Sequence, residues 1–295
     1  MTSVPDTVQR NIVQILERQS GKSVSLQQFS FTGGGCINHG GRLKTSSGDF
    51  FVKWNSAAHY PKMFEAEASG LGLLKRSTSL HGPAVIGWFE ADEYQGILLD
   101  FVESKTKKAS YWEDLGKGLA SLHRNSNETF GLDRSNYIGS LPQSNEPRPS
   151  WIEFFIHQRL SPQLELAFDS HHFDKSILKQ FEHLYTLLPS VMPVERPALI
   201  HGDLWSGNLI TNSIGAPCLI DPAVYYGHRE AELAFTQLFG GFDRTFYSSY
   251  DDAFKLSSGF QNRVDLYNLY PLLVHVNLFG GGYVGQASAV LKKYS

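Results

Sequence analysis

The first hundred residues change from a helical to a strand-like pattern of apolar positions. Val8, Ile12, Ile15 and Leu16 recur at helical spacing and predict an amphipathic helix over residues 4–20. From residue 26 onward, short apolar runs alternate with turn residues, which is typical of β-strands. The predicted strands span residues 26–31, 39–45, 50–54, 82–90 and 95–102, and a further helix is predicted over 61–77.

The remaining chain carries mainly helical periodicity. Residues 125–150 show no clear period, as in an irregular insert that carries substrate contacts. We therefore expect an α+β fold with a small sheet-containing part over residues 1–102 and a larger, mostly helical part over 103–295. Small strands are predicted at 199–200, 209–210 and 219–220, and helices at 111–124, 151–168, 173–188, 231–239, 244–257 and 260–280, with a short final helix.

Composition narrows the class of protein. The 295 residues are 41% hydrophobic and 19% charged, which is ordinary for a globular protein. The net charge of −3 provides no basic surface for nucleic acid or an anionic membrane. No apolar run is long enough to span a bilayer, no signal-peptide pattern is present, and two cysteines do not make a disulfide framework. We expect a cytoplasmic protein with no nucleic-acid or membrane partner.

A polar stretch among the small strands carries the strongest chemical signal. Asp203, Asn208 and Asp221 lie beside three short apolar pairs. This is the layout of a kinase catalytic loop, in which the first Asp accepts or orients the proton of a substrate hydroxyl. The Asn and the second Asp of such a loop hold magnesium ions on the ATP phosphates. The spacing therefore predicts phosphoryl transfer, with ATP and Mg²⁺ as cofactors.

A glycine-rich turn follows the first predicted strand. Backbone N–H groups of Gly33, Gly34 and Gly35 would approach a triphosphate closely, because glycine carries no side chain. A plain hairpin fits the same three glycines, and Asn38 stands where the third glycine of a protein-kinase loop is expected. Cys36 in this turn fits either an inert small residue or an exposed thiol that links two chains.

Two further segments fit a nucleotide site. Lys53 ends an apolar strand as the phosphate-pairing lysine of a kinase does. Glu65 and Glu67 in the next helix are its candidate partners, and because they face different sides, only one of them can point toward the lysine. After the fifth strand, backbone groups of the segment Asp100, Phe101 and Val102 would hold an adenine ring; an edge strand that leaves the domain fits this segment equally.

The residues after Asp221 exclude one kind of kinase. They contain no Ala-Pro-Glu element and no long activation segment. A protein kinase needs this segment to hold its peptide substrate and to be regulated. Its absence predicts a permanently assembled site for a smaller acceptor.

The chain resembles the fructosamine kinase (ketosamine kinase) family, which is itself similar to aminoglycoside and choline kinases. The resemblance covers almost the whole chain from Phe31 onward. One departure is Asn38-His39, where some members have an acidic residue after Cys-Ile. The resemblance is carried by residues 33–37, 51–53, 63–67, 201–208 and 221–242. Trp205 lies within the fourth of these segments.

The resemblance implies a two-lobed protein-kinase-like fold and an enzyme that phosphorylates a sugar hydroxyl of small or protein-linked ketosamines, with a role in protein deglycation. By position, Asp203 is the proton acceptor, and Asn208 and Asp221 are magnesium ligands. Lys53 and Glu67 are the phosphate-aligning pair, and residues 100–102 form the adenine hinge.

The acceptor pocket is predicted from residues near the catalytic loop. Trp205 follows Asp203 closely, and its ring would wall the pocket, although a core tryptophan fits the sequence equally. His228 and Glu232 are expected to line the same pocket. His201 is expected to order the loop by hydrogen bonding.

Other functions remain open at this point. A kinase for another small amine or an aminoglycoside-like acceptor fits the same motifs, and so does a catalytically silent nucleotide-binding scaffold. Retention of all five polar site residues argues against the scaffold. The sequence permits either a monomer or a dimer linked through Cys36.

Overall fold

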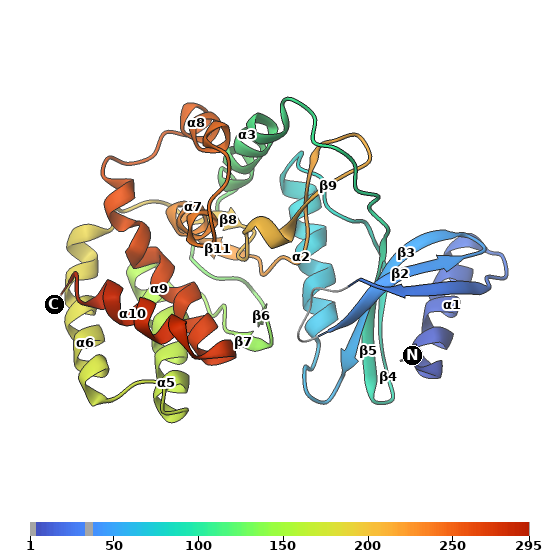
Figure 1. Ribbon diagram of the computed structural model, residues 1–295, viewed down its shortest axis with the longest axis horizontal. Helices are drawn as coiled ribbons and strands as arrows, with labels where there is room; N and C mark the ends of the chain where they lie inside the picture. Colours follow the sequence, from blue (N-terminus) through green and yellow to red (C-terminus); the bar gives the residue numbers. More distant parts are fainter. Residues whose placement is uncertain (1–3, 33–37, 295) are drawn as a thin grey trace. The chain divides into compact units, whose positions relative to one another are not determined.

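The computed structural model describes residues 4–32 and 38–294 (Figure 1). The chain forms two compact units. The first unit comprises Met1–Tyr111 and Ile210–Asp221, and the second comprises Trp112–Leu209 and Pro222–Ser295. The sequence-based division after residue 102 therefore differs from the structure, in which the connector after the sheet and residues 210–221 belong with the first unit. The predicted phosphate loop, Gly33, Gly34 and Gly35, lies outside the described residues, as does Cys36.

An antiparallel sheet of five strands forms the centre of the first unit. The strands lie in the order β1-β2-β3-β5-β4, so that β3 and β5 are interior strands and are paired on both sides. The elements of the sheet and its two helices are α1 (Asp6–Ser20), β1 (Leu26–Phe31), β2 (His39–Thr45), β3 (Gly48–Ser56), α2 (Met63–Ser77), β4 (Val85–Ala91) and β5 (Tyr94–Asp100).

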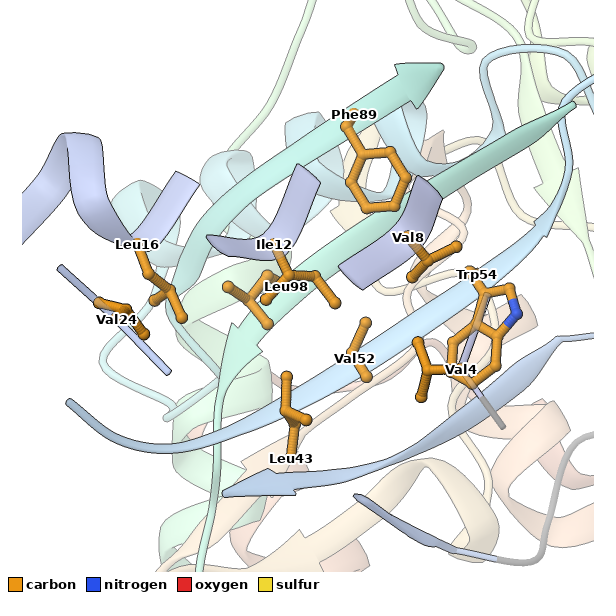
Figure 2. Packing of buried hydrophobic residues seen from close by; sticks show 10 residues of the cluster. All are labelled: Val4, Val8, Ile12, Leu16, Val24, Leu43, Val52, Trp54, Phe89 and Leu98. Atoms are coloured by element: carbon orange, nitrogen blue, oxygen red, sulfur yellow. The ribbon is translucent and has the colours of Figure 1, made fainter. Parts of the chain in front are cut away.

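The two-residue period of the strands sends side chains to opposite faces of this sheet. Val52 and Leu98 join Val8 and Ile12 of α1 in one buried cluster (Figure 2). The neighbouring residues on the same strands, Ile97 and Leu99 among them, pack with α2 in a second cluster. Because Lys53 follows Val52 directly, it belongs to the face that α2 covers.

The second unit is mainly helical, and short strand pairs connect its helices. Strand β8 (Ala198–Ile200) pairs with β11 (Tyr225–Gly227), so that the candidate catalytic loop, residues 201–208, and the segment after Asp221 are bound into one local framework. The helices are α3 (Tyr111–His123), α4 (Trp151–Phe154), α5 (Ser161–Asp169), α6 (Lys175–Val191), α7 (Arg229–Leu238), α8 (Arg244–Ala253), α9 (Phe260–Phe279) and α10 (Gly282–Leu291). Strands β6 (Asn136–Ile138) and β7 (Leu141–Gln143) form another short pair of this unit, whereas the pair of β9 (Leu209–Thr211) and β10 (Pro217–Leu219) belongs mainly to the first unit.

Two segments differ from the sequence-based predictions. The expected irregular insert contains the β6–β7 hairpin. The helix predicted over 151–168 is interrupted by a π-helical turn, Phe155–Leu160, just before Pro162. Proline has no N–H to continue the helical ladder, and the carbonyl of Gln158 instead accepts a hydrogen bond from Arg159 at 2.9 Å.

Candidate functional site

Lys53 of β3 lies between two carboxylates of the first unit. Its Nζ donates to Oε1 of Glu67 at 2.8 Å and also forms an ion pair with Asp221. Lys53 is 7% exposed, because α2 covers this face of the sheet. The structure thus brings together Lys53 and Glu67, the pair that the resemblance implied. The contact with Asp221 is additional to what the sequence predicted.

Burial and the neighbouring charges shift the pKa values of Lys53 and Glu67. Burial alone would lower the pKa of Lys53, but the carboxylates of Asp221 and Glu67 outweigh it and raise the pKa well above the usual value. Burial, together with the charge of Asp221, raises the pKa of Glu67 against the opposing effect of Lys53. Asp221 is the more exposed of the two carboxylates, with 45% of its side chain exposed.

The second unit presents Asp203 and Asn208 on one short loop. Asn208 Nδ2 donates to the backbone oxygen of Asp203 at 2.8 Å and to its Oδ2 at 2.8 Å. These two acceptors fix the orientation of the Asn208 amide, so its Oδ1 is directed away from Asp203. The loop backbone turns at Gly202, where φ is +85° and a Cβ would lie 2.1 Å from the carbonyl oxygen of Ala223.

The side-chain oxygens of the candidate site could supply only some of the ligands of a magnesium ion. Magnesium is held in proteins by one or two carboxylates together with substrate phosphates and water. Asp221 in the first unit and, separately, the Oδ1 of Asn208 in the second unit are oxygens of this kind. Among residues 4–32 and 38–294, no three His, Cys, Asp or Glu side chains form a group that would hold a metal ion. The donor chemistry thus fits an ion that arrives with its nucleotide.

Glu232 of α7 holds the backbone of the catalytic loop. Its Oε1 accepts from the amide of Gly202 at 2.7 Å, and its Oε2 accepts from the amide of His201 at 3.1 Å. His123 Nε2 donates to the same carboxylate at 2.8 Å. Burial favours the protonated acid, but these hydrogen bonds and the nearby histidines keep the pKa of Glu232 below its usual value. An ionised, buried carboxylate therefore positions the residues directly before Asp203.

The structure corrects the predicted roles of Glu232 and His228 as pocket-lining residues. Glu232 is 3% exposed and its oxygens already accept protein hydrogen bonds. His228 is fully buried; it accepts from the amide of Glu230 at the start of α7, and its Nε2 lies 3.2 Å from the carbonyl oxygen of Pro193. Both residues lie behind the loop, because the helix that follows β11 turns this face toward the core.

Replacing Glu232 with glutamine is expected to lower kcat about 10–100-fold and to leave MgATP affinity unchanged. The amide retains one acceptor oxygen but directs an N–H group at one of its present donors, which unsettles the loop backbone. Steady-state kinetics and thermal unfolding would be measured together. Glu230→Gln is the matched control, since Glu230 is buried in the same helix but pairs with Arg263 at 2.6 Å. Equal losses of kcat in the two variants would contradict a specific role for Glu232.

Trp205 is 36% exposed, which does not fit the alternative interpretation of a core tryptophan. Its indole ring covers Gly207, where a Cβ would lie 2.3 Å from two ring carbons. The glycine therefore makes room for the ring beside the 3₁₀ turn Ser206–Asn208. The ring also meets Phe239 edge to face, with centroids 5.9 Å apart.

The predicted adenine hinge follows strand β5. The carboxylate of Asp100 accepts from the amide of Ala84, and the amide of Asp100 donates back to the carbonyl of Ala84 at 3.0 Å. The amide of Phe101 donates to the carbonyl of Asp49 at 3.4 Å. The Asp100 side chain thus holds Ala84, the residue directly before β4, and the adenine contact expected from backbone groups of residues 100–102 stays a prediction.

Two further features concern membrane spans and thiol chemistry. In the part of the chain that the structure describes, no helix is both long and apolar enough to cross a membrane. Cys218 is buried in β10, and burial raises the pKa of its thiol to about 12, so this cysteine is an inert packing residue.

Curated relatives match the chain over nearly its full length. A Synechocystis protein named as a probable ketoamine kinase is 37% identical over 96% of both chains. The chloroplastic protein-ribulosamine 3-kinase of indica rice is 39% identical over 93% of this chain and 80% of its own. The mouse ketosamine-3-kinase is 33% identical over 95% of this chain and 99% of its own.

Solved structures share the fold. A Haemophilus somnus protein assigned by name as a fructosamine-3-kinase superposes with a TM-score of 0.88 at 27% identity, over 96% of both chains. An aminoglycoside phosphotransferase bound to AMP-PNP and hygromycin B gives 0.61 at 15% identity over 96% of this chain and 98% of its own. LicA bound to AMP gives 0.62 at 15% identity over 97% and 98%. The two distant structures show a shared protein-kinase-like fold.

The profile of the fructosamine kinase family matches residues 8–295. This match covers both units and every residue of the candidate site. The chain belongs to the fructosamine kinase family.

Proposed function

We propose that this enzyme transfers the γ-phosphoryl group of ATP to a sugar hydroxyl of a ketosamine, with Asp203 as the group that orients the hydroxyl. The observation that supports this role most strongly is the geometry of the loop from Asp203 to Asn208. Asn208 donates to Asp203, and the carboxylate of Glu232 accepts from the backbone amides directly before Asp203. Family membership and the named ketosamine kinases among the relatives support the acceptor class and a role in protein deglycation.

Asp203 acts through position more than through basicity. Phosphoryl transfer passes through a loose transition state, so the protein mainly orients the acceptor and neutralises charge. The Asn208 amide fixes Oδ2 of Asp203. The hydrogen bonds from the amides of His201 and Gly202 to Glu232 fix the backbone directly before Asp203. The Asp203 carboxylate so positioned would accept a hydrogen bond from the sugar hydroxyl and take its proton as the new phosphorus–oxygen bond forms and the bond between the γ-phosphorus and the ADP oxygen breaks.

Lys53 aligns the phosphates of the nucleotide. Its ion pair with Glu67 restrains the ammonium group, and its burial strengthens the interaction with phosphate oxygens. Asn208 and Asp221 are the residues proposed to hold Mg²⁺. When bound, this ion would supply charge neutralisation on the phosphate oxygens.

A panel of acceptors tests this function. The purified chain would be given MgATP with ketosamines of glycine and lysine made from tetrose, pentose and hexose sugars, and with choline and an aminoglycoside for comparison. We expect ADP release to depend on a ketosamine and the product to be a phosphate ester of its sugar. Release that depends only on choline or the aminoglycoside would assign the enzyme to another small acceptor, and release independent of any acceptor would contradict the proposal.

A further inference from the structure

A continuous row of aromatic side chains begins at the catalytic loop. Trp205 meets Phe239 at 5.9 Å between ring centroids, and Phe239 meets His275 at 4.8 Å. His275 in turn contacts Tyr283 at 4.9 Å and Phe279 at 5.6 Å. We call these five side chains, Trp205, Phe239, His275, Phe279 and Tyr283, the aromatic row. They come from the loop after Asp203, the C-terminal end of α7, the last turns of α9 and the start of α10, all in the second unit.

The row is accessible at both ends. Trp205 is 36% exposed and Phe279 is 56% exposed, although large aromatic side chains are usually covered. Gly240 and Gly282 lie beside the row in sequence, and the space around each is open, because an added Cβ would meet no atom within 4 Å.

The row has aromatic character without a fixed positive charge. The Nδ1 of His275 donates to the carbonyl of Pro271 at 2.7 Å, and burial lowers the pKa of the imidazole below its usual value, so this ring is neutral at pH 7. None of the cation–π contacts found among the described residues involves a ring of the row. Faces of Trp, Phe and Tyr rings attract ammonium groups and pack well on alkyl chains.

We propose that the aromatic row binds the amine substituent of the acceptor, an inference that rests on the proposed function. This substituent is the lysine side chain, with the adjoining peptide, to which the ketosugar is attached. A ketosamine consists of a sugar joined through a secondary ammonium to an organic substituent. When a sugar hydroxyl is held at Asp203, this substituent must continue beyond the sugar, and Trp205 begins an aromatic surface close to that point in the loop. The row therefore favours a long, cationic and partly apolar substituent over a small one.

The inference predicts a difference between two acceptors that share one sugar. The ketosamine of the tripeptide Ac-Leu-Lys-Leu-amide, attached at the lysine side chain, should have a kcat/KM about 10-fold higher than that of glycine in the wild-type enzyme. The Phe279→Ser/Tyr283→Ser variant should lose most of this preference through a higher KM for the peptide acceptor, with its kcat/KM for the glycine acceptor within about twofold of wild type. Phe279→Tyr, which retains the ring, should keep the preference.

Leu166→Ser is the matched control, because Leu166 is an exposed apolar residue of α5 in the same unit and outside the row, with 39% exposure. It should leave both acceptors unaffected. Thermal unfolding of each variant checks that the fold is kept.

The possible outcomes separate this inference from the proposed function. Equal kcat/KM for the two acceptors in the wild type, or an unchanged preference in the double variant, would overturn the role of the row while ketosamine phosphorylation stands. If neither acceptor is phosphorylated, the proposed function itself fails. Sedimentation would reveal a second copy of the chain as the occupant: a wild-type dimer that Phe279→Ser/Tyr283→Ser converts to a monomer would also overturn the inference.

Discussion

Replacing Asp203 with asparagine is expected to lower kcat by about 10²–10⁴-fold while MgATP still binds with an affinity within about twofold of wild type. The amide has the same shape as the carboxylate and keeps an oxygen that accepts from Asn208 Nδ2, so the loop geometry is preserved. It cannot take a proton, and it offers a weaker acceptor to the sugar hydroxyl. Lys53 and Glu67, which we propose to hold the nucleotide phosphates, are unchanged.

The two effects would be measured separately, kcat from acceptor-dependent ADP formation and MgATP affinity from calorimetric titration. Asp133→Asn is a suitable control, because the side chain of Asp133 lies in the same unit, is 77% exposed and is outside the loop. Turnover in Asp203→Asn that matches Asp133→Asn would remove Asp203 from the mechanism.

Replacing Lys53 with methionine is expected to raise the KM for ATP and to lower kcat/KM for ATP by about 10²-fold or more. Methionine retains most of the alkyl volume but loses the charge that Glu67 positions at 2.8 Å. Lys44→Met is the control, since Lys44 lies on the neighbouring strand β2 and is exposed. A wild-type KM for ATP in Lys53→Met would contradict the proposed contact with phosphate.

The same variant is expected to be less stable, in a pH-dependent way. Without Lys53, the buried carboxylate of Glu67 has no cation, and breaking such a pair costs about 3–5 kcal/mol. Burial raises the pKa of Glu67 in the folded state above its unfolded value, so stability is retained at acidic pH and is lost as the pH rises through the folded pKa. The deficit in Tm should therefore be larger at pH 8 than at pH 5. Adding Glu67→Leu should restore stability but not activity, and a pH-independent deficit would contradict this explanation.

The Lys53–Glu67 pair illustrates how much of the site could be predicted from sequence. Strand periodicity assigns Val52 and Lys53 to opposite faces of β3, and the structure places Val52 against α1 and Lys53 under α2. Helical spacing alone did not decide whether Glu65 or Glu67 is the partner of Lys53, because the two residues face different sides of α2. The family resemblance selected Glu67, and its hydrogen bond to Lys53 agrees with that choice.

The roles of Glu232 and His123 could not be predicted from local pattern. A polar residue on a helix is compatible with either a pocket or a buried network, and the choice depends on which neighbours supply hydrogen bonds. Glu232 meets the amides of His201 and Gly202 only because β8 and β11 pair and turn the start of α7 toward the loop. Long-range partners of this kind leave no periodic signal in the chain.

The most direct measurement is the phosphorus NMR spectrum of the wild-type reaction with MgATP and a lysine ketosamine. We expect a new phosphomonoester signal that grows in step with ADP, is coupled to a proton of the sugar and forms at least about 10²-fold more slowly with Asp203→Asn. A spectrum that contains only ADP and inorganic phosphate, or a phosphate ester that forms equally in Asp203→Asn, would contradict it.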